Sequence, residues 1–144
     1  MNLSFLNKLQ PLAFLVLRVV LGVIMVGHGY GKVFGRLRLH AAFVASLGMP
    51  AWPGYVSAFV EFFGGILLII GLVTRCAAIA VCIDMVVAIV KVHWHHGLLA
   101  QGGYQFPLAL AAIAFALIFT GAGPISLDWA FGRGGGERKF SRGA

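Results

Sequence analysis

Residues 53–92 read PGYVSAFVEFFGGILLIIGLVTRCAAIAVCIDMVVAIVKV, two apolar stretches joined by only a few residues around Val73 and Thr74. Each stretch is close to the ~20 residues that an α-helix needs to cross the hydrocarbon core of a bilayer. Because the connection is so short, the two helices must be antiparallel neighbours. Each stretch also carries one acid, Glu61 and Asp84. The sequence therefore predicts a membrane-spanning helical hairpin with carboxylates inside it.

Similar apolar stretches flank this hairpin on both sides. The 144 residues are 60% hydrophobic and only 10% charged, whereas a soluble domain is about 25% charged. Once the apolar stretches are assigned to spans, no segment of a size suited to a soluble catalytic domain remains. We predict an all-α fold, a transmembrane four-helix bundle with a short interfacial helix at residues 39–47, and spans at about 11–31, 53–72, 75–92 and 106–122.

The net charge of +7 is distributed mainly between and beyond the apolar stretches. That distribution is typical of topology signals and lipid headgroup contacts, and it argues against nucleic-acid binding. Lysine and arginine are more numerous on the side that would carry both termini, so we expect cytoplasmic termini. Residues 1–132 are predicted to form one membrane domain. The glycine-rich, basic tail at 133–144 is predicted to be disordered.

Arg18, Glu61 and Asp84 lie inside predicted spans. A charge near the bilayer centre costs about 2.5–3.5 kcal/mol on insertion scales, so such residues usually face a protein interior and pair with one another. Each of the three shares a helix face with small residues, where membrane helices approach closely. Helical rise places them at similar depths, and we predict an intramembrane Arg18–Glu61/Asp84 cluster. It could serve only to fix helix packing, or it could handle protons or substrate.

A second set of polar residues lies where the predicted spans reach the membrane face opposite the termini. An apolar slot capped by a few convergent polar groups suits an amphipathic ring such as a quinone. These side chains could equally be ordinary interfacial loop residues. The loop histidines have no Cys, Asp or Glu beside them, so we predict no metal site; no covalent cofactor motif is present either. The candidate quinone- or substrate-binding residues are His28, Lys32, His93, Tyr104 and Gln105.

The order of several short motifs resembles the DoxX family of small four-helix bacterial membrane proteins. After Arg18 the motifs are HGYGKVFG at 28–35, LGMP at 47–50, EFFGGILLIIGLVTR at 61–75, GGYQFP at 102–107 and GAGPISLD at 121–128. The resemblance covers roughly residues 18–128. Two departures stand out. Relatives often have an acid where this chain has Gln105, and Asp84 does not look like a regular family feature.

The resemblance implies a bacterial inner-membrane protein associated with redox chemistry. Some relatives are membrane subunits of thiosulfate:quinone oxidoreductases, and others accompany thiol and oxidative-stress enzymes. We therefore expect a membrane subunit of a quinone-linked redox system, with the lipid bilayer, a quinone and a soluble redox protein as partners. A non-catalytic anchor or scaffold for a soluble redox enzyme is an alternative. A small proton-coupled transporter using Glu61 is a second. The sequence leaves the catalytic residues and the oligomeric state open.

Overall fold

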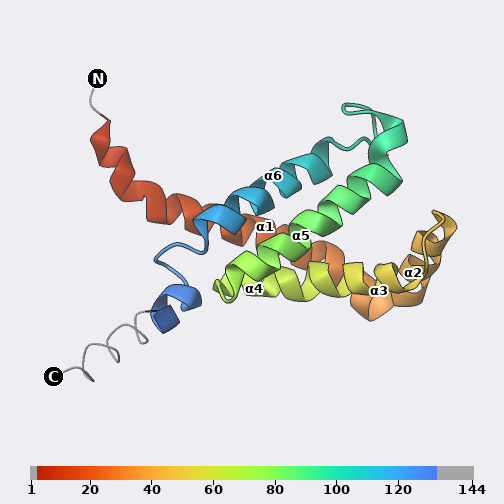
Figure 1. Cartoon of the computed structure of the whole chain (residues 1–144), viewed down its shortest axis with the longest axis horizontal. Helices are drawn as coiled ribbons and strands as arrows, with labels where there is room; N and C mark the ends of the chain where they lie inside the picture. The colour runs from red at the N-terminus through yellow and green to blue at the C-terminus, as the bar shows by residue number, and fades with distance from the viewer. Residues whose placement is uncertain (1–2, 133–144) are drawn as a thin grey trace.

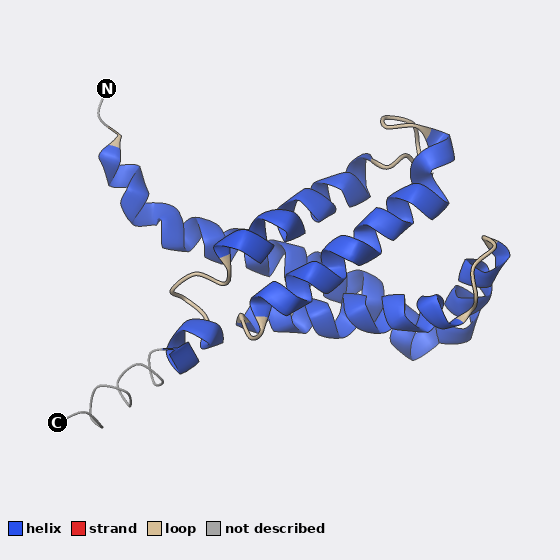
Figure 2. Ribbon diagram, viewed as in Figure 1, coloured by secondary structure: helices blue, strands red, loops and turns tan. Residues whose placement is uncertain are grey.

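The computed structural model describes residues 3–132, and every regular element in that range is helical (Figure 2). The predicted tail at 133–144 lies outside the described residues. Short 3₁₀ segments η1 (Ser4–Leu9) and η4 (Trp94–His96) and π-helical segments η2 (Val60–Gly64) and η3 (Ile89–His93) accompany the α-helices. The labelled α-helices are α1 (Gln10–Gly35), α2 (Leu37–Ser46), α3 (Trp52–Phe59), α4 (Gly65–Ile70), α5 (Thr74–Ala88) and α6 (Gln105–Thr120). Residues 127–132 are also helical.

Three continuous helical stretches are long and apolar enough to cross a membrane. They are Ser4–Gly35, Trp52–Ile70 and Thr74–His96. The fourth apolar helix, α6, has 16 residues, so its length is ~24 Å against a hydrocarbon core of ~30 Å. The all-α prediction is confirmed. The expected short helix between the first two stretches is also present, as α2.

Small residues bring α1 close to α4 and η2. A Cβ atom added to Gly22 would lie 2.7 Å from the carbonyl oxygen of Gly65, and one added to Gly29 would lie 2.7 Å from the Cα of Phe62. Real Cβ atoms essentially never approach so closely. Glycine at these positions therefore allows the two backbones to touch, as small residues do in other membrane helix pairs.

The short connection between α4 and α5 is a left-handed turn. Gly71 has φ +70 and Val73 has φ +48, and a β-branched residue rarely adopts the second conformation. The carboxylate of Asp128 holds this turn, because it accepts hydrogen bonds from the backbone N–H groups of Val73 (2.7 Å) and Thr74 (2.8 Å). The predicted antiparallel neighbours are thus joined as expected, and a distant carboxylate fixes their junction.

Apolar side chains divide between a core and an outer surface. The buried core includes Leu21, Leu68, Val81 and Leu117. Bulky residues on the other faces are exposed, and in a membrane they would contact lipid tails. This separation matches the prediction that the charged faces are lined with small residues. The exposed set on α4, α5 and η3 comprises Ile70, Ile79, Ile83, Val86 and Val90.

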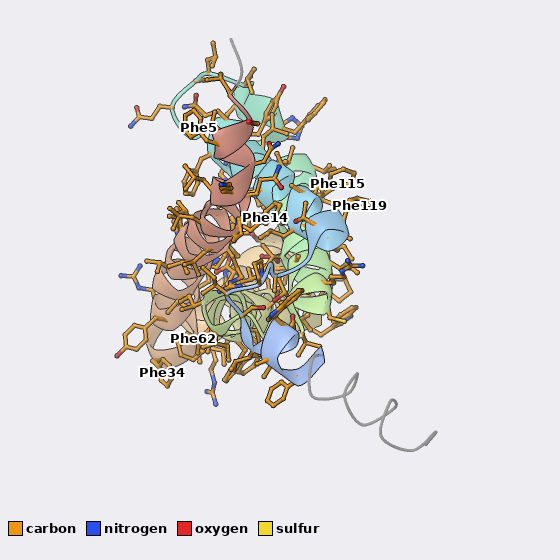
Figure 3. All side chains as sticks on the ribbon, turned by 90° about the vertical axis from the view of Figure 1, so that its left-hand side faces the viewer. Phe5, Phe14, Phe34, Phe62, Phe115 and Phe119 are labelled. Carbon is orange, nitrogen blue, oxygen red and sulfur yellow. The ribbon has the colours of Figure 1, made fainter. Side chains whose placement is uncertain are left out.

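The two ends of the molecule differ (Figure 1). Segment η1, the last described residues after α6 and the α4–α5 turn lie at one end, here called the terminal end. Helix α2 and residues 97–104 lie at the other, the loop end. Helices α5 and α6 form an antiparallel pair that diverges from α3 toward the loop end, while the first turns of α1 project beyond the rest. In Figure 3, Phe5 lies on this projecting part, whereas Phe34 and Phe62 lie close together, with ring centroids 5.3 Å apart.

Candidate functional site

A buried ion pair joins α1 to η2. The Nζ atom of Lys32 donates a hydrogen bond of 2.6 Å to Oε1 of Glu61. The side chain of Glu61 is 6% exposed and that of Lys32 is 26% exposed. The close approach at Gly29 explains the contact, because Lys32 lies one turn further along the same face of α1. Two residues that the sequence assigned to different candidate sites therefore meet.

Asp84 on α5 completes this constellation. Its carboxylate lies beside the Ser57 hydroxyl and within electrostatic range of both Glu61 and Lys32. Oε2 of Glu61 and Oδ2 of Asp84 are buried without a hydrogen-bond partner. We call Lys32, Ser57, Glu61 and Asp84 the acid site. Its two carboxylates against one ammonium leave acceptor capacity that the described side chains do not use.

The backbone at Glu61 departs from regular α-helix. Val60–Gly64 is π-helical, and single π-helical turns occur frequently at functional sites. The same segment carries Phe62 and Phe63, whose rings pack edge to face with their centroids 5.1 Å apart. The wider turn carries the carboxylate into the interior while Phe63, 50% exposed, stays outside. Neither apolar periodicity nor any turn residue in the sequence predicted this segment.

Arg18 is buried, as predicted, but its predicted ion pairs with Glu61 or Asp84 are wrong. Nη1 donates to the carbonyl oxygen of Ala122 at 2.6 Å, and Nη2 donates to that of Ile125 at 2.8 Å. Helix α6 ends at Thr120, so the carbonyl groups that follow lack helical donors. A buried carbonyl without a donor costs free energy, and the guanidinium supplies the hydrogen bonds. Arg18 therefore closes the terminal end rather than joining the acid site.

The sequence also gave Asp128 no role beyond membership of a motif. Burial raises the pKa of Asp128, but the hydrogen bonds from Thr74 and Val73, together with the Arg18 charge, lower that pKa overall below its ordinary value. A cavity of about 450 Å³ lies beside it, lined by the start of α5 and the residues after α6, including Arg75, Cys76 and Trp129. This cavity is at the terminal end, away from the acid site.

The remaining candidate quinone residues lie in two places near the loop end. The ring of His28 lies 5.8 Å from that of Phe106, next to exposed Gln105 at the start of α6. Nδ1 of His93 lies 2.7 Å from the carbonyl oxygen of Gly102, and Tyr104 stacks on Trp94 with centroids 5.5 Å apart. None of the five candidates lines either of the two cavities identified. Only Lys32 belongs to the acid site.

Metal binding needs several ligating side chains close together. Within residues 3–132, no three His, Cys, Asp or Glu side chains are grouped closely enough to hold a metal ion. The acid site combines two carboxylates, an ammonium and a hydroxyl, which suit proton exchange and hydrogen bonding. Its chemistry is therefore that of a polar cluster inside a membrane protein.

The apolar helices and the buried ion pair define a multi-pass helical membrane protein. A family model described as DoxX matches residues 13–94, and one described as "TQO small subunit DoxD" matches residues 54–140. The chain belongs to the DoxX family.

Two relatives cover most of the chain. A Bacillus subtilis (strain 168) protein named "Putative oxidoreductase CatD" is 32% identical over 123 residues, which is 85% of this chain and 90% of that protein. An uncharacterized protein of Haemophilus influenzae is 30% identical over 132 residues, covering 85% of this chain and 93% of its own length. No solved structure matches the chain.

Proposed function

We propose that this chain is the membrane subunit of a quinone-linked redox system. The observation that carries the proposal is the acid site, where the Lys32–Glu61 ion pair lies beside Asp84 with two buried carboxylate oxygens unpartnered. Ionisable groups inside a membrane protein commonly mark proton or substrate pathways. The descriptions "TQO small subunit" and "oxidoreductase" of related proteins support redox chemistry.

The acid site suits a reaction that consumes protons within the membrane. Reduction of a quinone to a hydroquinone takes up two electrons and two protons. Carboxyl groups positioned within hydrogen-bond reach are efficient proton donors and acceptors, and the ammonium of Lys32 can hydrogen-bond an oxygen of the ring. The electrons would come from a soluble partner protein or from the reductant that it binds.

A lipophilic ring could reach this site from the bilayer. Asp84 and Ser57 are only half-buried, and α5 diverges from α3 toward the loop end (Figure 1). The two unpartnered oxygens belong to Glu61 on η2, which continues α3, and to Asp84 on α5. Entry between α3 and α5 would bring polar ring oxygens to the carboxylates and leave an isoprenoid tail in lipid.

The proposal is tested by the ligands that the purified protein retains. Extraction in mild detergent followed by mass spectrometry of bound lipophilic compounds should recover a quinone. Glu61→Gln should lower its occupancy several-fold, because the change removes the ion-paired carboxylate. The control is His95→Gln, which alters an exposed residue outside the acid site. Absence of quinone from the wild type, or equal occupancy in Glu61→Gln, would contradict the proposal.

A non-catalytic anchor for a soluble redox enzyme is the second candidate. The cavity of about 450 Å³ at the terminal end favours it, because Arg75 and Trp129 give this face a basic and an aromatic group for a partner to contact. Co-purification of a stoichiometric soluble enzyme, without quinone, would support this alternative. The transporter hypothesis is weakened, since Glu61 is already engaged by Lys32.

We further propose four membrane crossings, with both termini in the cytoplasm of a bacterium. The support is the excess of Lys and Arg on the terminal side and the antiparallel arrangement of α5 and α6 (Figure 1). Under this topology α6 crosses as the fourth span despite its 16 residues. Local thinning of the bilayer accommodates short spans at modest cost.

A further inference from the structure

The buried hydrogen-bonding capacity that the acid site leaves unused is that of acceptors. Because Glu61 forms an ion pair with Lys32, its carboxylate is ionised, and an ionised carboxylate can only accept hydrogen bonds. Its Oε2 atom is buried without a donor, and so is Oδ2 of Asp84. Glu61 is 5% exposed as a residue, so bulk water does not satisfy it. A ligand that fits this site must bring hydrogen-bond donors.

The two redox forms of a quinone differ in this property. The oxidised form has two carbonyl oxygens, which are acceptors, whereas the hydroquinone has two hydroxyl groups, which both donate and accept. A quinone carbonyl near Lys32 would satisfy the ammonium but would oppose the lone pairs of Glu61 Oε2. A hydroxyl could accept from the ammonium and donate to the carboxylate at the same time. Only the reduced ligand satisfies both members of the ion pair.

We propose that the acid site binds a hydroquinone in preference to the corresponding quinone, with Glu61 Oε2 and Asp84 Oδ2 as the acceptors. This inference rests on the proposed function and specifies which redox form that site selects. Preferential binding of the reduced form raises the reduction potential of the bound two-electron couple, by about 30 mV for each tenfold preference. Electrons from a partner protein would therefore be drawn toward the ligand held at this site.

The preference can be measured without any turnover. The full chain in lipid nanodiscs is titrated, under anaerobic conditions, with a short-chain ubiquinone and separately with the same compound reduced to its hydroquinone. The wild type should bind the hydroquinone about tenfold more tightly or better. Glu61→Gln should bring the ratio of the two dissociation constants toward one, because a carboxamide supplies a donor beside its acceptor. Asp84→Asn should act in the same direction.

The control is Asp128→Asn, which makes the same chemical change at the terminal end and should leave the ratio unchanged. If Glu61→Gln does not fold, Asp84→Asn carries the test, since Asp84 is half-buried and outside the ion pair. Equal or tighter binding of the quinone by the wild type, or an unchanged ratio in both variants, overturns the inference while the proposed function stands. If neither redox form binds, the proposed function itself fails.

Discussion

At the scale of single residues, this chain stabilises two cations of α1, buried Arg18 and part-buried Lys32, in different ways. Lys32 pairs with a side-chain carboxylate, Glu61. Arg18 instead binds the backbone carbonyl groups of Ala122 and Ile125, and its planar fork of donors suits several acceptors at once. The first arrangement leaves acceptor oxygens available for a ligand. The second satisfies backbone carbonyl groups at the terminal end and, within the described residues, pairs the cation with no side-chain acceptor, so only the first is a candidate for chemistry.

The coupling free energy between Lys32 and Glu61 can be measured by a double-mutant cycle. Lys32→Met should lower the free energy of unfolding by about 1–3 kcal/mol, because it leaves a buried carboxylate without its donor. Glu61→Gln should cost a similar amount. The double variant should lose less than the sum, since removing both partners of a buried pair is often nearly neutral. Thermal unfolding in detergent measures all four proteins, and strictly additive losses would show that the pair does not couple.

The lowered pKa of Asp128 predicts that the stability of the folded protein falls at low pH. Because its folded pKa lies below its ordinary value, its contribution is fully present above the unfolded pKa of ~3.9 and is lost as pH falls through the lower, folded pKa. At pH 7, Asp128→Ala should destabilise the protein by about 1 kcal/mol, as removal of a helix cap does. The difference in unfolding midpoint between wild type and variant should shrink as the pH is lowered below about 4. A constant difference across that range would rule out the ionised carboxylate as the cap.

The sequence predicted that Arg18 is buried but not what it binds. Helical periodicity correctly placed Arg18 on the face with Gly22 and Gly29, because that inference needs only the geometry of one helix. Choosing the partner required knowing where α6 ends and which carbonyl groups are then left without donors. The prediction paired the guanidinium with side-chain charges only, whereas its acceptors are backbone carbonyl groups. Lys32 was assigned to the candidate quinone-binding residues, although its side chain pairs with Glu61.

At the scale of elements, α1 carries two sets of glycines with different roles. Gly29 contacts the backbone of η2, whereas a Cβ atom added to Gly27 or Gly31 would meet nothing within 4 Å. Gly29→Ala should therefore force α1 away from η2 and lower the free energy of unfolding by about 1–3 kcal/mol. Gly27→Ala and Gly31→Ala should leave stability unchanged or raise it by up to about 1 kcal/mol.

These three variants are matched controls for one another, because each adds one methyl group to the same helix. Thermal unfolding and quinone retention should be measured together. Gly29→Ala should impair both, since displacement of α1 also separates Lys32 from Glu61. Equal behaviour of the three variants would show that the α1–η2 contact is not as close as the structure describes.

The limits of the helices were largely predictable, whereas irregularities inside them were not. The second span was expected at residues 53–72 and runs over Trp52–Ile70, because apolar length sets the span and Pro53 suits its first turn. The short helix expected at 39–47 is α2, Leu37–Ser46. The amino-acid composition of η2 and η3 did not indicate that these turns are π-helical. They depend on contacts between helices, which one-dimensional periodicity does not contain.

At the scale of the whole molecule, the two ends have different constructions. Arg18 and Asp128 tie α1, the α4–α5 turn and the residues after α6 together at the terminal end. At the loop end, α5 and α6 diverge from α3 (Figure 1). The acid site lies between these regions, on the side that diverges.

The four-crossing topology makes a prediction about which residues share a membrane face. In a variant lacking both native cysteines (Cys76→Ser and Cys82→Ser), single cysteines at Ser46 and Leu99 should react with a membrane-impermeant maleimide from the same side. Cysteines at Ser4 and Ser126 should react only from the other side. The decisive comparison is Leu99 with Ser126, because α6 alone separates them. Since α6 is ~24 Å long, labelling of both residues from one side would mean that it enters the bilayer without crossing, leaving three spans and termini on opposite faces.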